Sequence, residues 1–423
     1  MTQYTYDLGD TDLYKLTMLK WVIEHYSEAR VRYELKVRKD VPFTAKDEED
    51  IAQRIREYGQ AKFSGECLVH LGARSPFLGA EFLTYLKGVA IDPDEVHLWR
   101  DENGFLRGIV EGLWAQTILW EIVCLAVISE VYFTNHHASL SDGQKRQIYE
   151  DARYKGQEFL KRKCFFIEMG TRRRYSQEVQ RLVMRGLVDG ASDPDTGACY
   201  LLGTSNVMFA AEFGLNPQGT MAHEIFSAVA AMAGVENANN VVLGKWANTY
   251  HGLLGVALPD TFTTEFFLRT YNPFYANLYY GLRHDSHQEP NVWTDMVLNH
   301  LQKLGVDTRA KRLVYSDGID SFDRVDAILK HRPDECMKSF GIGTWLTNDL
   351  KHINEAEALN VVMKLIAAQK NAYEPMYHAC KLSDVDGKET GDPVTIKEYK
   401  RKIDNAHPVP PIDEIIPQKR PAD

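Results

Sequence analysis

The sequence predicts an α/β fold: an irregular, TIM-like α/β barrel, preceded by a smaller N-terminal α/β domain and followed by an extended C-terminal strap. Three observations support this. Short apolar runs, most of them followed by Gly, Asp, Ser or Thr, recur between residues 164 and 384 with helical segments between them. Residues 1–135 mix helical and strand patterns instead, and prolines crowd residues 408–421. Strands that alternate with helices favour a parallel sheet, and about eight such units favour closure into a barrel.

The composition is typical of a soluble globular protein. The chain has 423 residues, enough for two or more domains, of which 44% are hydrophobic and 26% charged. Its formal net charge of −10 disfavours a nucleic-acid partner, because polyanion binding needs clustered Lys and Arg, but small anionic substrates remain compatible. The N-terminus has no signal-peptide pattern, and the most apolar run, 117–133, is too short and too charged to cross a membrane. We therefore expect a cytoplasmic protein.

The N-terminal domain is expected over residues 1–135. A helical stripe of apolar residues begins at Leu13, and residues 31–37 alternate like a half-buried strand. A further strand at 105–112 is expected to lead into a long apolar helix at 113–133. These elements predict a small sheet covered by helices.

The barrel domain is expected over residues 136–390, and the strap over 391–423. The predicted strands of the barrel are 164–169, 199–202, 219–222, 254–258, 278–282, 313–315, 340–342 and 377–382. Because barrel enzymes keep their sites at the C-terminal ends of the strands, the polar residues that follow these runs are the candidates for chemistry.

Four Gly-Thr pairs follow predicted strands. They are Gly170-Thr171, Gly203-Thr204, Gly219-Thr220 and Gly343-Thr344. Gly lets an anion approach backbone N–H groups, and Thr adds a hydroxyl donor. A single pair is more often a plain turn, but four at one end of one sheet favour a phosphate site. On the residues alone, this predicts a barrel enzyme that handles phosphorylated sugars.

Charged side chains accompany these loops. Arg172 follows the first pair, and its planar fork suits a carboxylate or a phosphate. Arg283 and Asp285 alternate at another strand end, so they are expected to point the same way. Asp317 either binds sugar hydroxyls, holds magnesium beside phosphates, or caps the following helix.

His223 follows the third Gly-Thr pair, with Glu224 beside it. A buried, hydrogen-bonded structural histidine is the usual alternative for a lone His. Among phosphate-type loops, however, an imidazole suits a base or a phosphoryl acceptor. Tyr14 lies far from these loops in the sequence, and on physical grounds alone it favours packing of an N-terminal helix.

Together these segments resemble the nicotinate phosphoribosyltransferase family. The segments that carry the resemblance are residues 10–18, 170–174, 203–207, 219–224, 260–262, 283–286, 316–320, 341–344 and 381–384. They occur in family order over nearly the whole chain. The resemblance implies an N-terminal α/β domain packed on an irregular α/β barrel, in a head-to-tail homodimer whose active sites form between the subunits.

The implied reaction joins nicotinate to phosphoribosyl pyrophosphate, giving nicotinate mononucleotide and pyrophosphate in NAD salvage. ATP hydrolysis through a phosphohistidine drives it, and Mg²⁺ is expected with the phosphates. His223 matches the phosphorylated histidine, with Asp285 and Glu224 expected beside it as catalytic residues. Tyr14 matches the tyrosine that stacks on the pyridine ring from the partner subunit. The other substrate-binding residues expected are Met169, Arg172, Thr204, Ser205, Arg283, Ser286, Asp317, Gly318, Gly341, Gly343 and Thr344.

Three positions bear on substrate and turnover. Ser205 stands where the related nicotinamide enzyme has an aspartate, and a hydroxyl can donate to the carboxylate of nicotinate, so Ser205 favours the acid. Met169 replaces the family's usual Phe as one wall of the ring site. Residues 287–289 replace the usual Gly-Asp after Asp285-Ser286. These departures predict altered affinity or impaired turnover. The alternatives are a relative that uses another pyridine acid and a ligand-binding homologue without catalysis.

Overall fold

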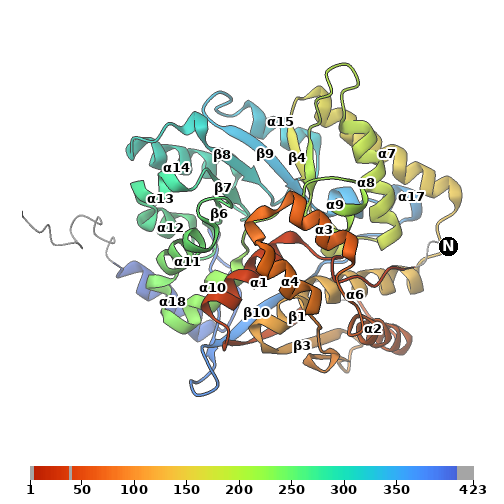
Figure 1. Cartoon of the computed structure of the whole chain (residues 1–423), viewed down its shortest axis with the longest axis horizontal. Coiled ribbons are helices and arrows are strands. Elements are labelled where there is room, and N and C mark those ends of the chain that lie inside the picture. Colours follow the sequence, from red (N-terminus) through yellow and green to blue (C-terminus); the bar gives the residue numbers. More distant parts are fainter. Residues whose placement is uncertain (1–3, 38–40, 407–423) are drawn as a thin grey trace, which may run out of the picture.

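A computed structural model describes residues 4–37 and 41–406 of the chain. These residues form two β-sheets, one of five strands in the order β11-β10-β1-β3-β2 and one of six strands in the order β5-β4-β9-β8-β7-β6. Figure 1 shows the parallel six-stranded sheet in the upper part of the molecule and the five-stranded sheet in the lower part, with helices α1 and α10 drawn between them.

The five-stranded sheet is antiparallel throughout. Its strands are β1 (Arg30–Val37), β2 (Val96–Arg100), β3 (Leu106–Leu113), β10 (Val361–Gln369) and β11 (Tyr377–His378). The strands expected at 31–37 and 105–112 are therefore confirmed. β10 pairs with β1 along its whole length, although the sequence groups residues 361–378 with the second domain. The C-terminal half of the chain thus completes the N-terminal sheet.

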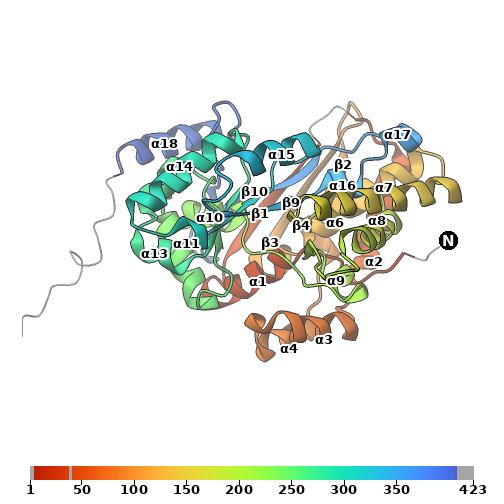
Figure 2. The ribbon, with the colours of Figure 1, turned by 90° about the horizontal axis from the view of Figure 1, so that it is seen from above.

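Six α-helices belong to the described part of the N-terminal region. They are α1 (Leu13–His25), α2 (Ala45–Tyr58), α3 (Gly65–Arg74), α4 (Ala80–Gly88), α5 (Trp114–Thr117) and α6 (Trp120–His136). The stretch Trp114–His136 is long and apolar enough to cross a membrane, but 89% of its most apolar window is buried inside the protein. A helix that is hydrophobic on all sides and enclosed in this way is a core helix. Helices α3 and α4 stand out on one side of the molecule in Figure 2.

The six-stranded sheet is parallel throughout. Its strands are β4 (Phe165–Glu168), β5 (Leu201–Thr204), β6 (Val256–Ala257), β7 (Gly281–His284), β8 (Arg312–Tyr315) and β9 (Met337–Ile342). The helices that accompany it are α7 (Asp142–Lys161), α8 (Gln177–Ala191), α9 (Val207–Glu212), α10 (His223–Ala233), α11 (Val235–Tyr250), α12 (Thr264–Thr270), α13 (Pro273–Leu278), α14 (Pro290–Lys303), α15 (Phe322–Lys330), α16 (Thr344–Thr347) and α17 (Lys351–Asn354).

This sheet does not close into the predicted barrel: within the described residues, β5 and β6 remain its edges. The run at 377–382 contributes β11 to the other sheet, and the run at 219–222 forms no strand. An extended segment still passes between the two edges. The backbone N–H of Gln218 donates to the carbonyl of Thr204 at 2.8 Å, and the Thr220 hydroxyl donates to the carbonyl of Val256 at 3.1 Å.

The packing of helix α1 against this segment explains why it builds no ladder. The Thr17 hydroxyl of α1 donates to the carbonyl of Thr220 at 2.6 Å. A Cβ on Gly219 would lie 2.9 Å from the backbone nitrogen of Tyr14, so α1 approaches the segment as closely as a glycine allows. Pro217 also lacks the N–H that a ladder needs. The run at 219–222 has strand-like composition, but the carbonyl of Thr220 accepts its hydrogen bond from helix α1 and not from a neighbouring strand.

The C-terminal segment expected to be an extended strap contains a helix in its described part. Helix α18 spans Pro393–Asp404. The Asp392 side chain accepts a hydrogen bond from the backbone N–H of Thr395, and the proline stands in the first helical turn, where its missing N–H costs nothing. Residues 407–423 of the predicted strap lie outside the described residues.

Candidate active site

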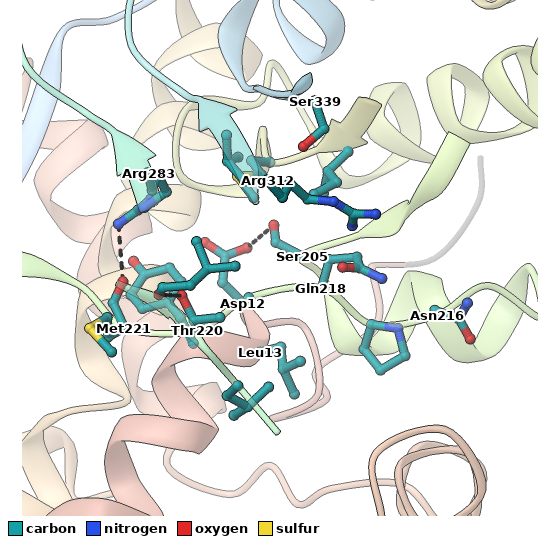
Figure 3. Close-up of a pocket in the computed structure, with 18 of the residues that line it drawn as sticks. Asp12, Leu13, Ser205, Asn216, Gln218, Thr220, Met221, Arg283, Arg312 and Ser339 are labelled. Carbon is teal, nitrogen blue, oxygen red and sulfur yellow. Dashed lines mark hydrogen bonds between the residues drawn. The ribbon is translucent and has the colours of Figure 1, made fainter. Parts of the chain in front are cut away.

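Two adjoining cavities lie beside the parallel sheet and meet near the C-terminal ends of its strands, with Tyr14 of α1 and His223 of α10 among their lining residues. The large cavity has a volume of about 420 Å³ and the small cavity about 270 Å³. Both are lined by Tyr14, Arg172 and Arg283, so the two spaces meet at these side chains. Figure 3 shows the large cavity with Arg283 at one side.

His223 is the first residue of α10 and lines the small cavity. Its Nδ1 lies 3.0 Å from Thr261 Oγ1, and its Nε2 lies 2.9 Å from Lys381 Nζ and 3.3 Å from a carboxylate oxygen of Asp285. Because the ammonium of Lys381 can only donate, Nε2 accepts, and the ring proton sits on Nδ1 and is donated to Thr261. Burial lowers the pKa of His223, and the charge of Lys381 lowers it further, against the opposing effect of Asp260 and Asp285. The ring is therefore neutral near pH 7.

Lys381 and Asp260 are neighbours of His223 to which the sequence assigned no role. Asp260 is fully buried, and its carboxylate accepts from Lys381 Nζ at 3.1 Å and lies 3.6 Å from His223 Nε2. Both residues lie in the segments that resemble the family. Asp260 could have been predicted from the sequence, because it follows a predicted strand. The same observation made Arg283 and Asp317 candidates.

Asp285 lies between His223 and Arg283, as the alternation along its strand end predicts. Its carboxylate is 3.6 Å from the guanidinium of Arg283, and it accepts a hydrogen bond from the Ser316 hydroxyl at 3.1 Å. Burial raises the pKa of Asp285, but the charges of Arg283 and, to a lesser extent, Lys381 oppose burial, and its pKa lies well below its usual range. Asp285 is an anion at neutral pH.

The departure from the family at residues 287–289 brings an imidazole into the small cavity. His287 Nδ1 lies 3.2 Å from the carboxylate of Asp317, and both side chains line the cavity together with Ser286. Burial and the nearby negative charge of Asp285 raise the pKa of Asp317. The neighbouring His287 opposes this rise in the pKa of Asp317.

Glu224 is placed differently from the catalytic residue that the sequence predicts. Its carboxylate accepts hydrogen bonds from the Tyr33 hydroxyl at 2.7 Å and from Trp114 Nε1 at 2.8 Å, and it forms an ion pair with Lys15. Lys15 is fully buried and also lies 2.6 Å from Glu121. Since both oxygens of Glu224 are occupied, this side chain fixes the start of α10 and is not free to move a proton at the site.

Tyr14, on α1, lines the large cavity of its own chain, whereas the resemblance expects this tyrosine at the site of the partner subunit. Met169 and Arg172 follow β4 and line the same space. The Ser205 hydroxyl donates to Asp12 Oδ1 at 2.7 Å (Figure 3). The hydroxyl proton of Ser205 is therefore committed to Asp12, and the expected donation to a ligand carboxylate is not available in this arrangement. Arg172 lines both cavities; its side chain is 48% exposed and forms an ion pair with the carboxylate of Glu121 at 3.5 Å.

Five of the expected binding residues line neither cavity: Thr204, Gly318, Gly341, Gly343 and Thr344. Thr204 is fully buried and donates its hydroxyl to the carboxylate of Glu168. A Cβ on Gly341 would lie 2.7 Å from the sulfur of Met169, so this glycine makes room for Met169 behind the cavity wall. Among the described residues, no group of three or more His, Cys, Asp or Glu side chains is arranged to hold a metal ion.

Comparisons with known proteins agree over most of the chain. A statistical model of the nicotinate phosphoribosyltransferase family matches residues 164–407, and that of its N-terminal domain matches residues 10–129. A nicotinate phosphoribosyltransferase from Desulforapulum autotrophicum is 36% identical over 90% of this chain and 95% of its own. One from Neisseria meningitidis serogroup A is 34% identical over 95% of this chain and 98% of its own.

Solved structures show the same likeness. The crystal structure of nicotinate phosphoribosyltransferase from Porphyromonas gingivalis superposes with a TM-score of 0.89 at 33% identity, covering 95% of this chain and 100% of the other. That from Vibrio cholerae has a TM-score of 0.85 at 32% identity, covering 97% of this chain and 95% of the other.

Proposed function

The chain belongs to the nicotinate phosphoribosyltransferase family, and we propose that it joins nicotinate to phosphoribosyl pyrophosphate, forming nicotinate mononucleotide and pyrophosphate in NAD salvage. One observation carries the proposal. A cavity that Met169 lines adjoins a cavity rich in charged side chains, and Tyr14, Arg172 and Arg283 line both. A ring in the first can therefore meet a phosphorylated sugar in the second.

The pyridine ring of nicotinate lies between Tyr14 and Met169, with its carboxylate toward Arg172. An aromatic ring and a thioether both cover ring faces, and a guanidinium binds a carboxylate through two parallel hydrogen bonds. Because Ser205 already donates to Asp12, selectivity for the acid over the amide comes from the charge of Arg172. The ring nitrogen faces the small cavity.

Phosphoribosyl pyrophosphate occupies the small cavity. Arg283 and Ser286 are donors there, and Asp285 and Asp317 are carboxylates that can accept from ribose hydroxyls. Mg²⁺ commonly binds through one or two carboxylates together with substrate phosphates, and these two acids suit that role, where the ion would neutralise the departing pyrophosphate. Phosphate binding by the backbone at Gly318, Gly341 and Gly343, and by Thr204 and Thr344, stays a prediction.

ATP phosphorylates His223. The lone pair of the neutral imidazole attacks the γ-phosphorus, the bond from that phosphorus to the bridging oxygen breaks, and ADP leaves with the electron pair. The charge of Lys381, 2.9 Å from the ring, offsets the charge of the transferred group. Water later takes the phosphoryl group and restores the histidine.

The proposal includes a cytoplasmic homodimer, as the family resemblance implies. Tyr14 lines the large cavity of its own chain. In the homodimer, the tyrosine that stacks on the pyridine ring comes either from this position or from Tyr14 of the partner subunit.

Product formation from nicotinate, phosphoribosyl pyrophosphate and Mg²⁺, with and without ATP, tests the proposal in wild type, His223→Ala and the control His352→Ala, whose histidine is on the surface. We expect wild type and the control to make nicotinate mononucleotide faster with ATP, and His223→Ala to lose the ATP effect. Folded protein that binds the ligands but forms no product from any of a panel of pyridine acids would favour the ligand-binding homologue. Product from a different pyridine acid alone would favour the relative with another substrate.

A further inference from the structure

The large cavity extends beyond the space that a pyridine ring needs. Met169 and Arg283 lie at the C-terminal ends of the strands, whereas Val256 and Arg312 are the first residues of β6 and β8. All of these strands are parallel, so the cavity runs along the inner face of the sheet from one end of the strands to the other. Its volume of about 420 Å³ lies in the range of sites for ligands larger than a single ring.

Two polar groups at the far end of this cavity have no protein partner. Among the described residues, the guanidinium of Arg312 has no hydrogen bond or ion pair, although its charge acts on Tyr280, which lines the same cavity. Ser339 is 1% exposed, and its hydroxyl has no hydrogen-bond partner. Figure 3 shows both side chains on the same side of the cavity. A buried hydroxyl without a partner costs free energy in the empty protein, and a ligand that bonds to it removes that cost.

The charge at this end of the cavity is positive. Arg74, at the end of α3, lines the cavity with Arg312, and the lining carboxylate of the large cavity, Asp12, is held by Ser205. Val314 alternates with Arg312 along β8, so the two point into the same space. The large cavity therefore carries an arginine side chain at Arg312 as well as at Arg172.

We propose that this end, formed by Arg312 and Ser339, is a second anion subsite that takes the acidic group of a pyridine or aryl acid longer than nicotinate. The inference rests on the proposed placement of nicotinate: with the ring nitrogen toward the small cavity, the opposite ring carbons face Arg312. Such a molecule keeps its first carboxylate on Arg172 and places its second acid on Arg312. The Ser339 hydroxyl donates to the same group.

Calorimetric binding of nicotinate with a carboxyalkyl chain on the ring carbon para to the nitrogen tests the subsite, with the matching carboxamide as neutral probe. Wild type should bind the acid about 10- to 100-fold more tightly than the amide, because a hydrogen bond to a charged group contributes about 1.5–3 kcal/mol. Arg312→Met should remove most of this preference, and Ser339→Ala a smaller part. Arg309→Met, which removes an exposed arginine paired with Asp307, should keep it.

The outcomes separate the inference from the proposed function. Absence of nicotinate binding in wild type would refute the proposed function, and the subsite with it. If wild type binds nicotinate but does not prefer the carboxyalkyl acid over the carboxamide, the subsite is refuted and the proposed function is not. The same holds if the preference survives Arg312→Met. Loss of affinity for nicotinate itself in Arg312→Met would put the nicotinate carboxylate on Arg312 and overturn a separate subsite.

Discussion

Replacing Lys15 with methionine tests the buried ionic cluster that joins α1 to α10. Lys15 is fully buried between Glu121 and Glu224, whose side chains are 10% and 7% exposed. Burial lowers the pKa of Lys15, but the two carboxylates outweigh burial and raise it, so the ammonium stays charged. Methionine keeps most of the volume of the side chain and removes the charge, which leaves two carboxylates facing each other in the core.

The structure sets the size of the expected effect. Removing one partner of a buried ion pair costs about 3–5 kcal/mol, because the remaining charge stays without compensation. Because the cluster is buried, solvent screens its charges little, and the expected loss of stability needs no large reduction for screening. Against a total stability of about 5–15 kcal/mol, Lys15→Met should lower the free energy of unfolding in urea by a large fraction. The unfolding midpoint should move to clearly lower urea with an unchanged slope.

Two controls decide the interpretation. Lys20→Met removes an outer lysine of the same helix, paired with Glu24, and should change stability by less than about 1 kcal/mol. Combining Lys15→Met with Glu121→Gln and Glu224→Gln should recover much of the loss, since the uncompensated charges are then gone. A loss below about 1 kcal/mol for Lys15→Met alone would refute the reasoning, because it would show that the carboxylates are protonated or hydrated without the lysine.

Three further changes have defined outcomes. Lys381→Met removes the charge that lowers the pKa of His223, so the acid limb of the ATP-stimulated rate should move to higher pH, whereas Lys388→Met, in the same cavity, should leave it in place. Met169→Phe gives the ring site an aromatic wall, worth about 0.5–1.5 kcal/mol, and should lower the KM for nicotinate two- to tenfold if the wall contacts the ring. Gly219→Ala puts a methyl group 2.9 Å from the backbone nitrogen of Tyr14 in α1, at a position whose own φ is +153°. The displaced helix should weaken nicotinate binding, seen as a higher KM in steady-state kinetics. An unchanged KM would contradict the close approach.

Local sequence signals predicted several of the residues that line the two cavities, but not the residues that hold those side chains in place. Because C-terminal ends of parallel strands meet at one edge, His223 and Asp285 could be expected together, and their atoms are 3.3 Å apart. The role of Glu224 could not be read in this way, because its donors come from residues 15, 33 and 114 on three other elements. The same limit applies to the fold. Strand β10 pairs with β1 across more than half the chain, and nothing near either strand indicates the other.

The ionic cluster also links the tyrosine proposed to contact nicotinate with the histidine proposed to accept the phosphoryl group. Tyr14 and Lys15 are successive residues of α1, and His223 and Glu224 are successive residues of α10, so the ring wall and the phosphoryl acceptor are held by one buried ion pair. Glu224→Gln keeps the shape of the side chain and the bonds from Tyr33 while weakening the attraction to the lysine.

If the pair couples the two ends, Glu224→Gln should make less nicotinate mononucleotide per ATP hydrolysed, measured with both products in one assay. A ratio equal to wild type, with only a lower unfolding midpoint, would show that the cluster stabilises the fold without coupling the two steps. Energetic coupling requires one structural element whose position both sites influence. Helix α10 is such an element, because it carries both His223 and Glu224, which forms the ion pair with Lys15.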